Sequence, residues 1–338
     1  MASMKTNFLL FLLLTFLGCR EKYGLNYGTF PSKEPTNLID LNSPYDEMNS
    51  DFVSPFLSAG VTLIFSSNAT TKGEHFDLDA RGLSFDQSRE NGLFSFSVNQ
   101  IMGQNEVVRN QLFEINSDCE ERGPYSLGSS SGVSYRLFSR DCEGKSHIYY
   151  NEFEKTAPFA YRSESFRVTL ANENASEMYP SFYGANFKKG EDGPIQGIAQ
   201  KMLFSSNQDG AFDIYETDIP SGISALEFLK DPSPKTVKKL NLNTASNDHM
   251  PFVDGDLLVF ASDRPGGYGG YDLYYSQKTA NGWTEPVNFG AKINSEFDEF
   301  RPVVSDHFDF TNRLMIFSSN RPGGLGGFDL YFVGIEKF

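Results

Sequence analysis

Two stretches near the C-terminal end are nearly identical. Residues 259–274 read VFASDRPGGYGGYDLY, and residues 316–331 read IFSSNRPGGLGGFDLY. In each, apolar and polar residues alternate on both sides of a glycine-rich segment, which is typical of two strands joined by a tight turn. The repeated unit is therefore predicted to be strand, turn, strand.

Weaker copies of this unit occur earlier, and a second motif precedes every copy. In the last repeat that motif spans residues 293–302 and reads INSEFDEFRP. The prolines that place the five repeats along the chain are Pro55, Pro124, Pro180, Pro251 and Pro302. The first strand of each unit is expected to start at its proline, where a missing N–H is tolerated. Two further strands then lie in the repeated stretch, and a fourth follows.

Units of four short antiparallel strands are typical of propeller blades. The last unit ends without a fourth strand, but residues 34–38 (EPTNL) match the fourth strand at 285–289 (EPVNF). The sequence therefore predicts an all-β fold: a single β-propeller of four-stranded blades, closed by an N-terminal strand that completes the last blade. Five blades are favoured, and six remain open because residues 79–114 are too long for one fourth strand.

The combined pattern of Pro, Phe-x-Ser-Asn/Asp-Arg, Gly and Asp-Leu-Tyr is similar to the TolB-like (WD-like) β-propeller repeats of bacterial envelope proteins. It is most specific in the two C-terminal repeats and weakest in the second, where His147 replaces the Asp. The resemblance implies a non-catalytic binding or scaffolding role toward an envelope protein or polysaccharide. On this basis the chain is not expected to be an enzyme.

The first residues resemble a lipoprotein signal peptide. Lys5 precedes an apolar run at residues 8–17, which is too short to cross a bilayer, and residues 15–19 read TFLGC. We expect residues 1–19 to be removed up to a lipidated Cys19, residues 20–33 to form a short tether, and residues 34–338 to form the propeller. An ordinary signal peptide with an incidental Cys19 is the alternative.

A lipid at Cys19 would attach the protein to a membrane through acyl chains such as palmitate. Arg20 follows the cysteine, which favours the outer membrane and leaves the leaflet open. The net charge of −15 argues against nucleic acid as a partner, because phosphate binding needs Lys and Arg.

The other two cysteines are expected to meet. Cys119 lies before the first strand of its blade and Cys142 lies after the second, so both fall at the same end of the sheet. A disulfide is predicted, and a pair of buried free thiols is the alternative.

The same reasoning predicts that charged motif residues brace the turns. Arg321 is expected to pair with Asp298 or Glu299, and Arg264 with Asp248, because arginine offers a planar fork suited to carboxylates. Asp272 and Asp329 are expected to cap the turns. A polar ligand-binding rim is the alternative for these residues.

No metal site or cofactor is predicted. The four histidines show no paired metal-ligand spacing, and the Asp of the glycine-rich segment lies one position late for a calcium β-roll. The alternative function is a glycan-active hydrolase or lyase with carboxylates in the propeller channel. Its candidate residues are Asp254, Asp256 and Asp306.

Overall fold

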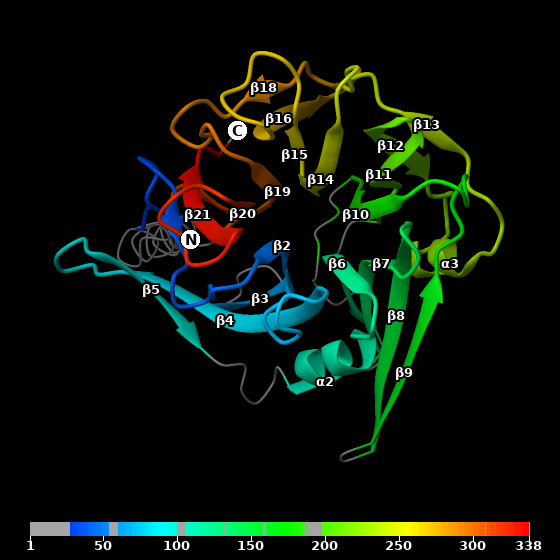
Figure 1. Cartoon of the computed structure of the whole chain (residues 1–338). Coiled ribbons are helices and arrows are strands. Elements are labelled where there is room, and N and C mark those ends of the chain that lie inside the picture. Colours follow the sequence, from blue (N-terminus) through cyan, green and yellow to red (C-terminus); the bar gives the residue numbers. More distant parts are fainter. Residues whose placement is uncertain are drawn as a thin grey trace, which may run out of the picture.

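Five antiparallel sheets lie in a ring around one axis (Figure 1). The computed structural model describes residues 28–53, 60–99, 106–130, 133–157, 160–185, 187, 189, 198–307 and 309–337. Each sheet is one blade, and its first strand lies next to the axis. The prediction of a five-bladed, all-β propeller is confirmed.

The blades follow one another in chain order. Blade 1 contains β2 (Glu47–Phe52), β3 (Gly60–Ser67), β4 (Asp77–Gln87) and β5 (Phe94–Asn99). Blade 2 contains β6 (Glu120–Ser130), β7 (Val133–Asp141), β8 (Ser146–Ala157) and β9 (Ala160–Arg167). Blade 3 contains β10 (Glu177–Tyr183), β11 (Lys201–Asp209), β12 (Ala211–Asp218) and β13 (Val237–Lys239). Blade 4 contains β14 (Asp248–Asp254), β15 (Leu257–Ser262), β16 (Asp272–Thr279), β17 (Gly282–Trp283) and β18 (Val287–Asn288). Blade 5 contains β19 (Glu299–Ser305), β20 (Arg313–Ser319) and β21 (Asp329–Ile335), and β1 (Thr36–Asn37) completes it.

The N-terminal strand closes the ring as predicted. In β1, Thr36 lies opposite Phe332 and Asn37 lies opposite Tyr331 of β21. The chain just before β1 also packs on blade 5, because the ring of the buried Phe30 stacks on Phe310 with the centroids 3.9 Å apart. The outer edge of the last blade is therefore covered by a strand from the start of the chain.

Residues 79–114 do not form a sixth blade. They contain most of β4, the hairpin strand β5 and most of the helix α2 (Glu106–Ile115), which lies beside blade 2 in Figure 1. Val108, Leu112 and Ile115 of α2 are buried in an apolar cluster that also contains Phe138 of β7. The segment is long because it builds an elongated hairpin and a covering helix.

The first strand of each blade is irregular at one point. In blades 2 to 5 the proline of the repeat lies at that point. Each first strand contains a register shift, and the first residue inside the shift has a positive φ. These residues are Asn49, Gly123, Tyr179, Met250 and Arg301. In blade 1 the residue after Asn49 is Ser50 and not a proline. The strand β2 ends at Phe52, before the predicted position at Pro55, and Pro55 lies outside the described residues.

The second strands lie in the middle of their sheets and are buried on both faces. Every residue of β15 is buried, as are nearly all residues of β3 and β20. This explains why these strands read as nearly continuous apolar runs with small Ser residues. A second helix, α3 (Ala225–Lys230), begins at a capping box formed by Ser224 and Glu227. No described helix has the length and apolar character needed to cross a membrane.

Candidate functional site

The predicted arginine pairs form at the ends of the blades. Arg264 contacts Asp248 through Nη2, and Arg321 Nη2 donates to Glu299 Oε1 at 2.8 Å. Both carboxylates belong to the first residue of an inner strand and are fully buried. Of the two predicted partners of Arg321, the structure places Glu299 in contact.

Asp298 instead joins two neighbouring blades. Its Oδ1 accepts the N–H of Tyr271 from blade 4 at 2.9 Å, while its own N–H donates to Asn320 Oδ1. Asp272 and Asp329 each accept two N–H groups from the glycine-rich turn that precedes them. The donors are Tyr268 and Gly269 for Asp272, and Leu325 and Gly326 for Asp329.

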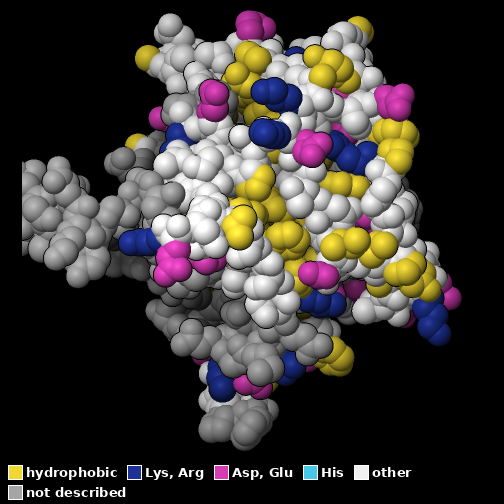
Figure 2. All heavy atoms as spheres, turned by 90° about the vertical axis from the view of Figure 1, so that its left-hand side faces the viewer, with side chains coloured by type: hydrophobic (Ala, Val, Ile, Leu, Met, Phe, Trp, Pro, Cys, Tyr) yellow, Lys and Arg dark blue, Asp and Glu magenta, His cyan; other side chains and the backbone are white. Residues whose placement is uncertain are grey.

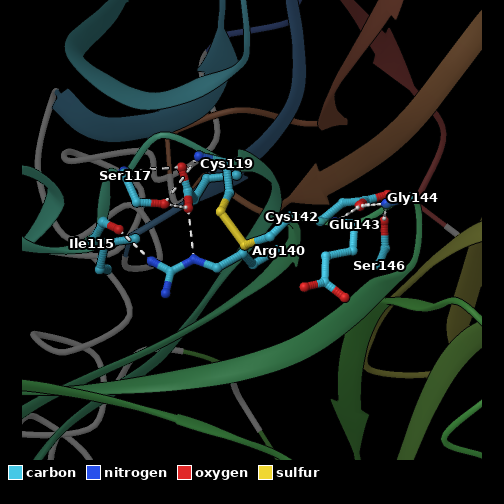
Figure 3. Close-up of a disulfide and its surroundings, with 10 residues drawn as sticks. Ile115, Ser117, Cys119, Arg140, Cys142, Glu143, Gly144 and Ser146 are labelled. Carbon is cyan, nitrogen blue, oxygen red and sulfur yellow. Dashed lines mark hydrogen bonds and ion pairs between the residues drawn. A yellow bond between two sulfur atoms is a disulfide. The ribbon is translucent and has the colours of Figure 1, made fainter.

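Cys119 and Cys142 are joined by a disulfide between the start of β6 and the end of β7 (Figure 3). Next to it, Arg140 donates from Nε to Glu121 Oε1 at 2.7 Å and from Nη2 to the Ile115 carbonyl at 2.5 Å. Arg140 therefore binds the buried carboxylate of blade 2 as Arg264 and Arg321 bind those of blades 4 and 5. Cys19 lies outside the described residues.

A different group of side chains meets at the axis. We call Asp51, Tyr125, Arg136, Lys189 and Arg301 the axial cluster. Asp51 of β2 is fully buried; its Oδ2 accepts the N–H of Ser126 at 2.8 Å, and its Oδ1 contacts Lys189 Nζ. Because Lys189 follows β10 of blade 3, this ion pair crosses from the first blade to the third.

The cluster holds three cations around Asp51. Burial lowers the pKa of Lys189 to about 8, and Asp51 opposes this shift. Burial likewise lowers the pKa values of Arg136 and Arg301 to about 10, again opposed by Asp51. Such desolvated charges are costly unless they are paired, so Asp51 is central to the stability of this group.

Tyr125 connects the axial cluster with a second carboxylate. Its hydroxyl accepts the Phe182 N–H at 3.2 Å. Burial is the largest cause that raises the pKa of Tyr125, and the charges of Asp51 and Asp254 raise it further. Because Asp254 ends β14 of blade 4 and Tyr125 lies on β6 of blade 2, Asp254 acts across the axis.

The other two carboxylates considered for a channel site lie elsewhere. Asp256 is exposed in the turn between β14 and β15. The side chain of Asp306 is 51% exposed and pairs with Arg313 and Lys337, each at 3.4 Å. Asp254 is therefore the candidate whose charge is linked to the axial cluster, through Tyr125.

His249 is buried on the inner strand β14. His249 stacks on Phe212 with the ring centroids 4.0 Å apart and lies edge-on to Tyr179. Burial, with a smaller effect of Arg301, lowers the pKa of His249 to about 3, so its ring is neutral at physiological pH. Among the described residues, no group of three or more His, Cys, Asp or Glu side chains could hold a metal ion.

Figure 2 shows one side of the molecule, where acidic and basic side chains are interspersed among neutral and hydrophobic ones. The described part of this side carries no broad basic area. This distribution agrees with the strongly negative net charge of −15.

No protein-family model and no curated protein matches the chain. The fold is similar to that of the endo-arabinase from Bacteroides thetaiotaomicron, with a TM-score of 0.50 and 11% identity over 92% of this chain and 98% of that one. Two α-L-arabinofuranosidases also match over 91% of this chain and 96% of theirs. The one from Coprinopsis cinerea gives a TM-score of 0.49 at 11% identity, and the one from Podospora anserina gives 0.48 at 8%.

The structural match corrects the family prediction. The endo-arabinase shares this propeller fold along nearly its whole length, so the assignment to TolB-like (WD-like) repeat proteins is wrong. The non-catalytic binding role and the absence of enzymatic activity were inferred from that assignment, and they are corrected with it. The repeat pattern reports blade construction, which unrelated propellers share.

Proposed function

We propose that this chain is a glycan-active enzyme, a glycoside hydrolase or lyase, with Asp51 and Asp254 as the paired carboxylates of its site. The observation that carries the proposal is that two carboxylates act on the Tyr125 hydroxyl near the axis: Asp51 of blade 1, which accepts the N–H of the adjacent Ser126 at 2.8 Å, and Asp254 of blade 4, whose charge raises the pKa of Tyr125. Glycosidic cleavage requires two carboxyl groups that flank the scissile bond, about 5 to 9.5 Å apart.

The two carboxylates have different surroundings, which suits two different roles. Asp254 is only partly buried, so it can meet the glycosidic oxygen and exchange a proton with it. Asp51 is buried and paired with Lys189, so it supplies negative charge near a sugar carbon that becomes positive in the transition state. Contact between a sugar and Asp51 requires the Lys189 ammonium group to move aside.

The fold supports this choice of reaction. The endo-arabinase from Bacteroides thetaiotaomicron is built on a similar propeller along nearly its whole length. Its name says that a protein with this fold cleaves a glycan. We extend that class of reaction to this chain, but not the particular substrate.

The experiment measures new reducing ends released from a panel of plant and bacterial polysaccharides, with ultraviolet absorbance to detect the unsaturated products of a lyase. We expect the wild-type protein to release product, and Asp51→Asn and Asp254→Asn to lose at least 100-fold in rate. The control variants Asp256→Asn and Asp306→Asn should keep full activity because they leave the axis unchanged. Retention of activity in both axial variants would overturn the proposal.

The site of action is also a proposal. We propose that an acyl chain at Cys19 attaches the enzyme to the outer membrane, where it meets an envelope or surface polysaccharide. Incorporation of labelled palmitate into the wild-type protein, compared with Cys19→Ser, tests this attachment. Equal labelling of the two proteins would exclude it.

A further inference from the structure

The start of each inner strand carries a buried carboxylate, and three blades bind it in the same way. In blades 2, 4 and 5 one guanidinium contacts both this carboxylate and a main-chain carbonyl from the segment before the strand. The arginines are Arg140, Arg264 and Arg321, and their carbonyl partners are those of Ile115, Leu242 and Ile293.

The guanidinium in these blades also lies over a stacked pair of aromatic rings from the second and third strands. In blade 5, for example, Arg321 Cζ is 5.3 Å from the Phe317 ring and 5.1 Å from the Tyr331 ring. Arg140 and Arg264 lie in the same way over the corresponding Phe–Tyr pairs of blades 2 and 4. Each guanidinium site therefore has three parts: a carboxylate, a carbonyl and an aromatic pair.

Blade 3 has the carboxylate and the aromatic pair but no arginine. Its carboxylate is Glu177, which is 2% exposed, and its aromatic pair is Phe204 and Tyr215, with centroids 6.0 Å apart. Leu170 lies seven residues before Glu177, one more than the spacing in the other blades, and it is buried as Leu242 and Ile293 are. Gln208 occupies the position of Arg264 and Arg321, and its N–H bonds Ser206 Oγ as theirs bond the matching serines.

A small pocket adjoins the blade 3 carboxylate. A pocket of about 80 Å³ is lined by Arg167, Thr169, Leu170, Glu173 and Glu177. Glu177 Oε1 is buried without a hydrogen-bond partner, whereas in blade 1, which also lacks the arginine, Glu47 Oε1 accepts bonds from two serine hydroxyls. An unpartnered buried carboxylate oxygen is costly, so blade 3 lacks a donor that the other blades supply.

We propose that this pocket, the blade 3 pocket, binds a guanidinium group from outside the chain, carried by a small molecule or by an arginine side chain of a partner. The carboxylate of Glu177 and the carbonyl of Leu170, both of which line the pocket, would accept its N–H groups. Glu173 adds negative charge at the rim. Arg167, also at the rim, is exposed and donates to His147 Nδ1 at 3.1 Å.

The probe is ethylguanidinium, titrated into the whole protein at pH 8 with calorimetry and with NMR of ¹³C-labelled glutamate side chains. We expect saturable binding to the wild-type protein, binding at least ten-fold weaker in Glu177→Gln, and no binding in Gln208→Arg, which fills the pocket with its own guanidinium. Gln208→Met is the matched control, because it keeps the length of the side chain without a cation and should bind as wild type does. Ethylammonium, which lacks the planar fork, should bind more weakly.

A second readout does not depend on the ligand. Gln208→Arg should raise the melting temperature, whereas Gln208→Met should not, because only arginine can pair with Glu177. The proposal is overturned if Gln208→Arg binds ethylguanidinium as well as wild type does, or if wild type shows no saturable binding. It is also overturned if binding appears only in Arg167→Ala, since Arg167 would then be the occupant of the pocket.

Discussion

The main-chain N–H of Phe328, in the last blade, donates to Asp46 Oδ1 of the first blade at 2.8 Å. Asp46 N–H in turn donates to Asn68 Oδ1, within its own blade. Asp298 makes the same two bonds between blades 4 and 5. The ring is therefore closed by the contact that also joins neighbouring blades in the interior of the chain, in addition to the pairing of β1 with β21.

Asp46→Ala should destabilise the protein by about 1–3 kcal/mol, because it leaves the Phe328 N–H without its acceptor. For a domain of this size that corresponds to a fall in melting temperature of about 2–4 °C per kcal/mol, measurable by calorimetry. Asp40→Ala, an exposed position on the same segment, is the control and should melt like wild type. Equal melting of the two variants would show that the bond does not help to close the ring.

The closing contact also depends on a glycine. A Cβ added at Gly326 would lie 1.6 Å from the Tyr45 carbonyl oxygen, which is backbone and cannot rotate away. Gly326→Ala should therefore separate blades 5 and 1 and destabilise the protein by more than about 3 kcal/mol. Gly82→Ala is the control, because its Cβ would meet its nearest neighbour at an ordinary 3.4 Å. Similar denaturant midpoints for both variants would contradict the close approach.

Reduction of the disulfide should lower the stability by about 3 kcal/mol, since Cys119 and Cys142 are 23 positions apart and the bond restrains a loop of that length in the unfolded chain. The measurement is the melting temperature with and without reductant. The double variant Cys119→Ser/Cys142→Ser should melt like the reduced protein and should not respond to reductant. A response of the double variant would assign the effect to another cause.

The blades were predictable because their construction repeats. The glycine-rich turns at 266–270 and 323–327 are flanked by strands in both copies, and in both copies an acid at the start of the inner strand comes with an arginine after the second strand. The same residue types therefore occur at matching structural positions in several blades. The match between residues 34–38 and 285–289 then placed the closing strand.

The axial cluster was not predictable in the same way, because the residue types of its members do not recur from blade to blade. Asp51 stands where the other inner strands carry Tyr125, Ser181, Phe252 and Val303. Lys189 comes from a connection between strands, outside the repeat altogether. An alignment of blade 1 on Glu47 instead of Pro55 would have singled out Asp51 as the charged residue of that position, but its pairing with Lys189 depends on the three-dimensional ring.

The pH dependence of stability should report the buried His249. Its pKa is about 3 in the folded protein and near 6.5 when unfolded, so between these values the unfolded chain binds more protons. Stability should therefore fall as the pH drops from 6.5 toward 3, by up to about 1.4 kcal/mol per pH unit from this residue. His249→Phe keeps a flat ring on Phe212 but cannot bind a proton, so its stability should decline less steeply over the same range. Urea unfolding of both proteins at several pH values measures the difference, and parallel curves would mean that His249 is protonated without unfolding.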